Sequence, residues 1–352
     1  MTKGTVRASI SLSTGVLIVG AGPVGLTLAI DLAWRGIDVV VIETRDRGEP
    51  PSVKCNHVAA RSMEVFRRLG VARAVRDADA LPPDYPNDVA FRTTTTGIEF
   101  ARIHIPCRRD RYEDKTGPDG WWPTPEPPHR INQIYLEPVL FAHAAEQRHI
   151  RILNHTRLVG FDQTEAGVTA VAEDIAGGDQ VAITCAYMIG CDGAHSEVRR
   201  AIGARLAGDA VVQRTQSTYI RAPDLIARMQ APPAWSTQSL NPRRSANMFA
   251  IDGRETWLIH NYLRPEESGF DAVDRDRCIR LILGVGGDFN YSVISKEDWI
   301  GRRMVADRFR RGRVFICGDA AHIWVPFAGY GMNAGIADAM NLSWMLAGVL
   351  TG

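Results

Sequence analysis

Apolar residues gather in short runs at the start of the chain, with one helical stripe between them. Continuous runs over 16–19 and 39–42 predict two buried strands. Between them, Leu28, Leu32 and Ala33 share one face of a predicted helix, and Gly36 ends it. Strand, helix and strand in this order predict an α/β fold with a parallel sheet.

The later pattern predicts further helices and a β-hairpin. Helical spacing recurs over 59–69, 136–148 and from 331 onward, and Ser196 can cap a short helix over 198–202. Alternating runs over 168–173 and 180–185 predict a hairpin that turns at Gly177-Gly178.

The segment 206–294 has the texture of an antiparallel sheet. Strands are predicted over 217–221, 245–251 and 255–262. We therefore expect a second domain inserted into the first. Alternation puts Tyr219 and Arg221 on one side of their strand. In the strand over 255–262, alternation places two sets of side chains on opposite faces: Trp257, Ile259 and Asn261 on one, and Leu258, His260 and Tyr262 on the other.

The segment 81–129 is rich in proline and contains the pair Trp121-Trp122. Because proline disrupts helices and central strands, we expect a long loop here. Two interpretations remain open, namely a lid over a site and an irregular surface insertion.

Composition excludes some classes of function. The 352 residues are 45% hydrophobic and 23% charged, with 41 basic against 40 acidic side chains, so neither nucleic acid nor an anionic membrane is an expected partner. The six cysteines show no paired metal spacing, which favours reduced thiols in a cytoplasmic protein without a metal site. No segment is apolar for long enough to span a bilayer. The last helical pattern stops at Gly352 without a cap, and we expect a natural C-terminal extension to be absent from this chain.

The turn between the first strand and helix carries the clearest chemistry. Gly20, Gly22 and Gly25 allow a tight turn, close approach of a pyrophosphate and close helix packing, respectively. Glu43 ends the second strand and is placed to accept a ribose hydroxyl, which favours FAD or NAD over NADP. The basic residues Arg45 and Arg47 keep that preference open.

Two further glycine-containing turns follow strands. One is Asp192-Gly193, and the other begins at Gly318-Asp319 and continues through Pro326 to the start of the last helix at Gly329 and Gly331. A strand-end aspartate can accept hydrogen bonds from a polyol, and a helix N-terminus favours negative charge. Each turn alone has a structural interpretation.

Together the three motifs resemble the FAD-dependent aromatic hydroxylases, the flavoprotein monooxygenases of the para-hydroxybenzoate hydroxylase and phenol hydroxylase type. The resemblance is carried by Gly-Ala-Gly-Pro-Val-Gly, by Cys-Asp-Gly-Ala-His-Ser-Glu-Val-Arg, and by Gly-Asp-Ala-Ala-His with Gly-Tyr-Gly-Met-Asn. It implies a Rossmann-like FAD-binding domain, formed by 1–80, 130–205 and 295–352, with an inserted antiparallel-sheet substrate domain formed by 81–129 and 206–294.

The resemblance also implies roles for single residues. Glu43 would bind the adenosine ribose, with Arg45 beside it. Arg61 and Gln133 would contact the pyrophosphate and ribityl region, and Asp319 the ribityl chain. Asp192 and Gly193 would serve both FAD and the nicotinamide donor. Pro326 would lie near the oxygen-reacting edge of the flavin. The N–H groups at the start of the last helix would lie near its pyrimidine edge, where they would stabilise the anionic reduced flavin: Gly329, Gly331, Met332 and Asn333.

The implied reaction consumes NADH or NADPH and O2 and hydroxylates a small phenolic or related aromatic compound through a flavin C4a-hydroperoxide. For the substrate's polar contacts we nominate His57, Tyr219, Arg221 and His260. Each could instead be structural: Tyr219 and His260 as core residues, and Arg221 as a surface ion-pair partner. Relatives of this type also form homo-oligomers.

Two other functions remain open. The chain could be another FAD enzyme of this fold, an oxidase or a halogenase, although the halogenase motif Trp-x-Trp-x-Ile-Pro does not occur. It could also be a non-catalytic FAD-fold protein that binds a lipid or a partner. The second alternative predicts no NAD(P)H consumption.

Overall fold

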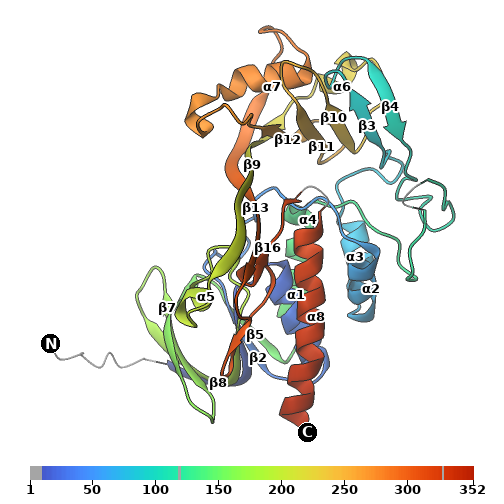
Figure 1. Cartoon of the computed structure of the whole chain (residues 1–352). Helices are drawn as coiled ribbons and strands as arrows, with labels where there is room; N and C mark the ends of the chain where they lie inside the picture. Colours follow the sequence, from blue (N-terminus) through green and yellow to red (C-terminus); the bar gives the residue numbers. More distant parts are fainter. Residues whose placement is uncertain (1–9, 118–119, 327–328) are drawn as a thin grey trace.

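The first part of the molecule is built on a mostly parallel sheet (Figure 1). The computed structural model describes residues 10–117, 120–326 and 329–352. Along the sheet the strands run β14-β15-β8-β1-β2-β5, and all neighbours except β14 and β15 are parallel. Their bounds are β1 Ile10–Val19, β2 Val39–Ile42, β5 Ile150–Leu153, β8 Gln180–Gly190, β14 Arg310–Arg311 and β15 Val314–Ile316.

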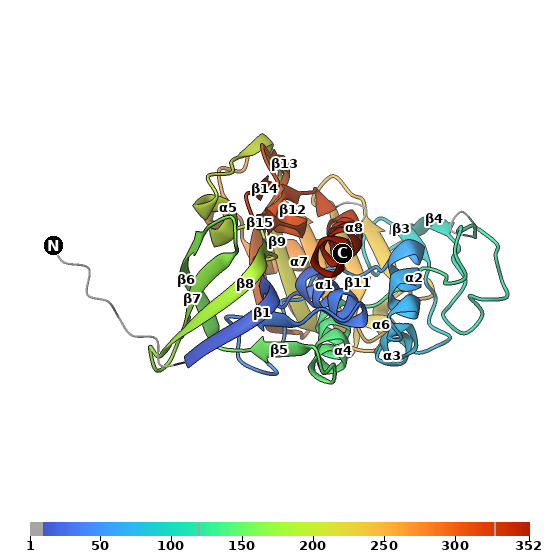
Figure 2. The ribbon, with the colours of Figure 1, turned by 90° about the horizontal axis from the view of Figure 1, so that it is seen from below.

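Both faces of this sheet are covered, which explains the continuous apolar run in β1. Val16 and Ile18 face the helices, whereas Leu17 and Val19 face the other side. Helices α1 (Pro23–Trp34), α4 (Gln133–Ala145) and α8 (Tyr330–Thr351) lie together, and α1 contacts both of the others (Figure 2). The opposite face is covered by the hairpin of β6 (Thr156–Gln163) and β7 (Val168–Asp174), with α5 (Glu197–Ala201) nearby.

The second part is a sheet with the strand order β16-β13-β9-β12-β11-β10-β3-β4, antiparallel except between β10 and β3. Helix α7 (Arg275–Leu283) covers one face over a core that contains Trp257, Ile259 and Ile220. The strands β9 and β13 are long and connect the two parts (Figure 1). The bounds are β3 Val89–Arg92, β4 Glu99–Ile103, β9 Leu206–Arg221, β10 Ser236–Ser239, β11 Ala246–Ala250, β12 Thr256–Tyr262, β13 Ser292–Ala306 and β16 His322–Ile323.

Several local predictions are confirmed. The hairpin of β7 and β8 forms in the expected register, and Ser196 caps α5 by accepting the Arg199 N–H at 2.9 Å. The 59–69 pattern is helix α2 (Ala60–Arg68), which α3 (Ala72–Asp77) follows. In β12 the expected alternation holds, with Trp257 and Ile259 in the core. Among the described residues, no helix is both long and apolar enough to cross a membrane.

The prediction that 81–129 contains no strand is wrong. The segment contributes β3 and β4, and β3 lies inside the second sheet between β10 and β4. The prolines explain the error, because Pro86 and Pro106 flank the two strands and none lies between them. Proline restricts only its own position and the one before it, so a proline-free interval inside a proline-rich segment can still pair.

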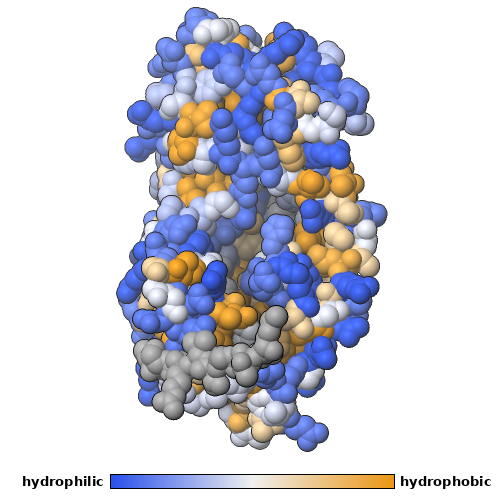
Figure 3. Space-filling model, turned by 90° about the vertical axis from the view of Figure 1, so that its left-hand side faces the viewer, coloured by the Kyte–Doolittle hydropathy of each residue, from blue (hydrophilic) through white to orange (hydrophobic). Residues whose placement is uncertain are grey.

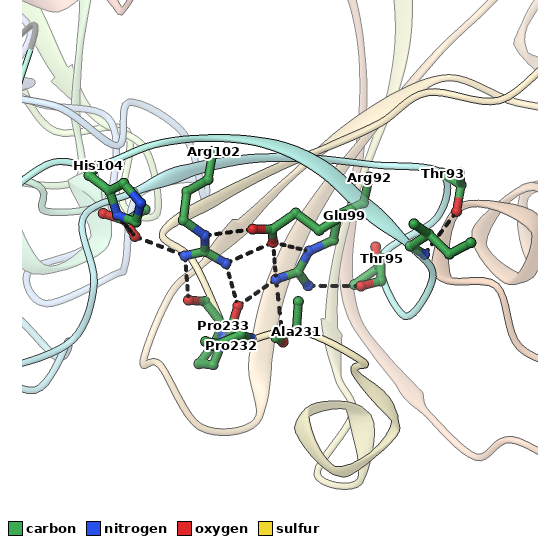
Figure 4. A network of polar contacts seen from close by, with 11 residues as sticks. Arg92, Thr93, Thr95, Glu99, Arg102, His104, Ala231, Pro232 and Pro233 are labelled. Carbon is green, nitrogen blue, oxygen red and sulfur yellow. Dashed lines mark hydrogen bonds and ion pairs between the residues drawn. The ribbon is translucent and has the colours of Figure 1, made fainter.

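Buried charge fixes this hairpin (Figure 4). Arg92 is fully buried and donates to the Glu99 carboxylate at 3.0 Å and to the Thr95 carbonyl at 3.0 Å. Arg102 donates to the same carboxylate at 2.8 Å and to Asp88 at 2.8 Å. Both guanidinium groups also donate to the Pro232 carbonyl, so they attach β3 and β4 to the segment that enters β10.

Candidate functional site

The glycine turn between β1 and α1 has the geometry that its sequence predicts. Gly20 has a φ of +105°, and a Cβ there would lie 2.5 Å from the Cys191 carbonyl oxygen. A Cβ on Gly25 would lie 2.0 Å from the Gly20 carbonyl oxygen, so α1 packs on the turn only with glycine at this position. A Cβ on Gly22 would meet no described atom within 4 Å, so its open side is available to a bound group. Pro23 begins α1.

An ionic network continues from the end of β2. Glu43 is buried, accepts the Ala21 N–H at 2.7 Å and pairs with Arg45 at 3.2 Å. Arg45 also pairs with Glu137 of α4 at 2.5 Å, and the Gln133 amide donates to Glu137 at 3.0 Å. Burial alone would raise the pKa of Glu43, but the hydrogen bonds and charge of Arg45 outweigh it and hold the pKa below its ordinary value.

In the second turn, at the end of β8, the aspartate carboxylate is hydrogen-bonded to residues that follow it in the chain. Asp192 accepts the Ser196 hydroxyl at 2.5 Å and the Val198 N–H at 3.1 Å, and Gly193 has a φ of +73°. The Asp192 carboxylate therefore stabilises the start of α5.

The third turn brings Asp319 to the start of α8. The Asp319 side chain reaches solvent, and a Cβ on Gly331 would lie 4.0 Å from its Oδ1 atom. Although Asp319 is exposed, the protein atoms crowded around its carboxylate raise its pKa, opposed by the charges of Lys54 and His322. Gly329 is the left-handed N-cap of α8, with a φ of +67°, and Pro326 before it is exposed.

Asn333 ties the start of α8 to the segment before α2. Its Nδ2 atom donates to the carbonyls of His57 at 3.1 Å and Gly329 at 2.7 Å, and its Oδ1 atom accepts the Ala59 N–H at 2.8 Å. Met332 beside it is buried in the helix-facing core. The expected role of these residues concerned their N–H groups, so the side-chain bonds of Asn333 were not predicted.

A cleft of about 770 Å³ joins the two parts of the molecule. It brings together four nominated residues, Gly22, Arg45, Gln133 and Tyr219. Its other walls come from the 49–54 segment, including Lys54, and from β13, including Glu297. The molecule seen from the side is hollowed between its upper and lower parts, and hydrophilic side chains cover most of the upper part (Figure 3).

A row of aromatic rings crosses the second sheet. Successive ring centroids lie 5.1, 5.6 and 5.7 Å apart along Trp235, Phe249, His260 and Trp299. The Ser217 hydroxyl lies 3.0 Å from His260 Nδ1, and burial lowers the pKa of His260 to about 4, so the ring is neutral. The Arg130 guanidinium lies 4.2 Å from the Trp235 ring centroid.

Other nominated residues lie apart from the cleft. Arg221 is exposed and donates to Glu255 at 2.8 Å, which is the ion pair of the structural alternative. Arg61 is exposed in the first turn of α2. Trp121 is 81% exposed, whereas Trp122 packs against Arg111 and Lys115.

Sequence reasoning missed Glu137, Asp338 and most of the aromatic row. Asp338 of α8 accepts the Gly318 N–H at 3.1 Å and lies 2.6 Å from His322. Glu137 shares the buried stripe of α4 with Leu140 and Ala144, and an acid on an apolar stripe was a usable signal. Trp235 precedes β10, Phe249 lies in β11 and Trp299 lies in β13, so no local spacing connects them.

These arrangements fit an extended dinucleotide. The Gly22 side of the turn is open, Glu43 is held at the strand end, and the Asp319 carboxylate is accessible beside the start of α8. Residues 13–352 match the family model described as FAD binding domain. The chain belongs to this FAD-binding domain family.

Named relatives agree with this assignment. The chain is 31% identical over 356 residues to a putative polyketide hydroxylase of Streptomyces halstedii. This alignment covers 96% of the chain and 60% of that protein. The chain is 30% identical over 363 residues to 2,4-dichlorophenol 6-monooxygenase of Delftia acidovorans, covering 97% and 58%. The structure of the rebeccamycin biosynthetic enzyme RebC with reduced flavin superposes with a TM-score of 0.85 at 33% identity, covering 98% of this chain and 62% of that one. The chain thus spans about three fifths of the length of these relatives.

Proposed function

We propose that the protein is an FAD-dependent monooxygenase that hydroxylates a phenolic or related aromatic compound, with NADH or NADPH as electron donor and O2 as oxidant. The observation that carries the proposal is the cleft, which extends from the glycine turn and Arg45 to Tyr219 on the second sheet. The cleft therefore connects the proposed cofactor turn with Ser217, Tyr219 and Leu258 of the second sheet.

The residues that would hold FAD are those of the three turns. Gly22 and the start of α1 would receive the pyrophosphate, Glu43 the adenosine ribose, and Asp319 the ribityl chain. Arg45, Arg61 and Gln133 complete the proposed set, with Asp192 and Gly193 at the neighbouring strand end. Bound FAD would supply two-electron chemistry with the nicotinamide donor and activation of O2.

The chain's own contribution to the reaction is orientation and exclusion of water. The aromatic row offers faces on which an aromatic ring can stack, worth about 0.5–1.5 kcal/mol per ring pair. Tyr219 and His260 offer hydroxyl and imidazole groups on the same sheet face, while Arg221 lies at the exposed end of β9 beside Glu255. Pro326 and the start of α8 would border the reacting edge of the cofactor, where water must be kept out.

The names of the relatives support an aromatic substrate but disagree on its size. One is named for polyketides and another for 2,4-dichlorophenol. The proposal therefore extends to the class of hydroxylated aromatic compounds, from single rings to fused rings.

The test uses the purified protein loaded with FAD and a panel of single-ring and fused-ring phenols. We expect some phenols to stimulate oxidation of NADH or NADPH and to gain one oxygen atom, detected by mass spectrometry. Failure of the purified protein to bind FAD would refute the proposal. Oxidation that yields only hydrogen peroxide with every phenol would instead indicate an oxidase, and no oxidation would indicate a binding protein.

A further inference from the structure

The strongest unassigned feature is the imidazole of His57, which lies between α8 and the segment that enters α4. The next residue, Val58, forms a two-way backbone bridge with His129, with N–H to O distances of 2.8 and 2.9 Å. The His57 carbonyl accepts from Asn333 at 3.1 Å. A Cβ on Gly329 would lie 3.5 Å from His57 Cβ and 3.7 Å from its Nδ1 atom. The ring is therefore fixed against the N-cap of α8.

The Nε2 atom of this ring is buried and has no hydrogen-bond partner in the part of the chain that the structure describes. An unpaired buried polar atom costs about 1–3 kcal/mol, so such atoms in native proteins usually have a role. The other nominated histidine differs, because His260 has the Ser217 hydroxyl at 3.0 Å. His57 is therefore the nominated histidine with an unmet hydrogen bond.

The surroundings keep this ring neutral. Burial is the main cause, and the charges of Arg130, His129 and Arg111 add to it, so the pKa of His57 lies well below its ordinary value. A neutral imidazole has one donor and one acceptor nitrogen. A hydroxyl group both donates and accepts, so it can pair with Nε2 in either tautomer.

The neighbouring residues point to an aromatic carrier for that hydroxyl. His129, which pairs with the residue after His57, is followed by Arg130, and Arg130 lies over the first ring of the aromatic row. Arg130 therefore links the aromatic row to the segment that pairs with the residue after His57. Positive charge from Arg130 also favours an electron-rich or ionised ring oxygen.

We propose that Nε2 of His57 hydrogen-bonds to the phenolic hydroxyl of the substrate and thereby selects phenols over the corresponding ethers. This inference rests on the proposed function and names one contact within it. His57 is then a substrate-binding residue, and its neighbour Asn333 is a positioning residue that acts through the backbone.

The experiment measures binding of 2-naphthol and of its methyl ether, 2-methoxynaphthalene, to the FAD-loaded protein, followed by the absorption of the bound flavin. The wild type should bind 2-naphthol at least about tenfold more tightly than the ether, since one hydrogen bond to a buried acceptor is worth that factor. In His57→Phe this ratio should fall toward one, while the Kd of the ether stays within about twofold. His57→Gln, which keeps hydrogen-bonding atoms, should restore part of the preference.

The control is His149→Phe. His149 pairs with Asp38 at 2.7 Å, where the two residues precede β2 and β5 at the N-terminal ends of these strands. This variant should leave the ratio unchanged. FAD content and urea unfolding of each variant show whether it is folded. A wild type that binds both probes equally, or neither, overturns the inference, as does an unchanged ratio in a folded His57→Phe. An active enzyme with an unchanged ratio would refute only the role of His57, whereas a wild type that takes up no FAD would refute the proposed function.

Discussion

Asn333 donates from its side chain to the backbone carbonyl of His57 at 3.1 Å, so the first turn of α8 holds a segment 276 positions earlier in the chain. The same side chain accepts the Ala59 N–H at 2.8 Å. The Asn333 side chain thus holds residues 57–59, which precede α2, against the start of α8.

The first prediction concerns the Asn333 amide. Asn333→Ala should lower the free energy of unfolding by about 2–4 kcal/mol, because it removes three hydrogen bonds and leaves the Ala59 N–H without its partner. Urea unfolding at neutral pH measures the loss. The matched variant is Asn341→Ala on the same helix, where the side chain is exposed and should cost less than about 0.5 kcal/mol. Equal effects of the two variants would contradict a special role for Asn333.

A second prediction separates cofactor binding from folding at the glycine turn. Gly22→Ala should leave the unfolding free energy of the FAD-free protein within about 1 kcal/mol of wild type, because its Cβ meets no described atom within 4 Å. It should nevertheless weaken FAD binding by at least about tenfold, because the added methyl would occupy the space proposed for the pyrophosphate. Flavin fluorescence titration measures the affinity.

Gly25→Ala is the contrasting variant, since its Cβ would lie 2.0 Å from the Gly20 carbonyl oxygen. It should destabilise the FAD-free protein as well. If Gly22→Ala bound FAD as tightly as wild type, the pyrophosphate would not lie at this turn.

The sequence predicted the opening β1-α1-β2 unit because its signals are local. Strand β1 is a continuous apolar run, the glycines follow it at once, and Glu43 ends the next strand, so each step depends on residues close along the chain. The same holds for the Ser196 cap and for the α2 pattern.

What the sequence could not predict depends on partners far along the chain. Strand β3 pairs with β10, which lies more than a hundred residues later, and Arg92 of β3 is stable in the core only because Glu99 and the Pro232 carbonyl receive it. The aromatic row forms only when separate strands align. The nomination of Arg221 illustrates the limit, because alternation gave its side of the strand but not its exposed position beside Glu255.

The third prediction follows from the acid at the end of β2. The folded state holds the pKa of Glu43 below its ordinary value of 4.5, so its ionised form adds stability above that pH, and this part is lost as the pH falls through the folded pKa. Glu43→Gln should therefore be less stable than wild type at pH 7, and the difference should shrink below about pH 4.5. Urea unfolding across this range tests the slope. A difference that is constant with pH would mean that the Glu43 charge contributes nothing to folding.

The last prediction has the opposite sign and concerns Asp79. Its side chain is only 4% exposed, and its Oδ2 atom lies 3.9 Å from Arg108 Nε and 4.0 Å from His129 Nε2, too far for hydrogen bonds. Burial raises the pKa of Asp79 to about 7, against the Leu81 N–H and the Arg108 charge. The folded state therefore favours the neutral carboxyl, and the associated stability is complete below the unfolded pKa and lost as the pH rises toward 7.

Asp79→Asn keeps a neutral group of the same shape, so the variant should gain stability relative to wild type as the pH rises. We expect the gap in unfolding free energy to widen by about 1–3 kcal/mol between pH 5 and pH 8 in urea titrations. Asp84→Asn is the control, because its carboxylate is 63% exposed and should give the same small difference at both values. If the stability difference between Asp79→Asn and wild type narrowed with rising pH, Asp79 would be held as a carboxylate. It would then be a buried ion-pair partner of Arg108 and His129.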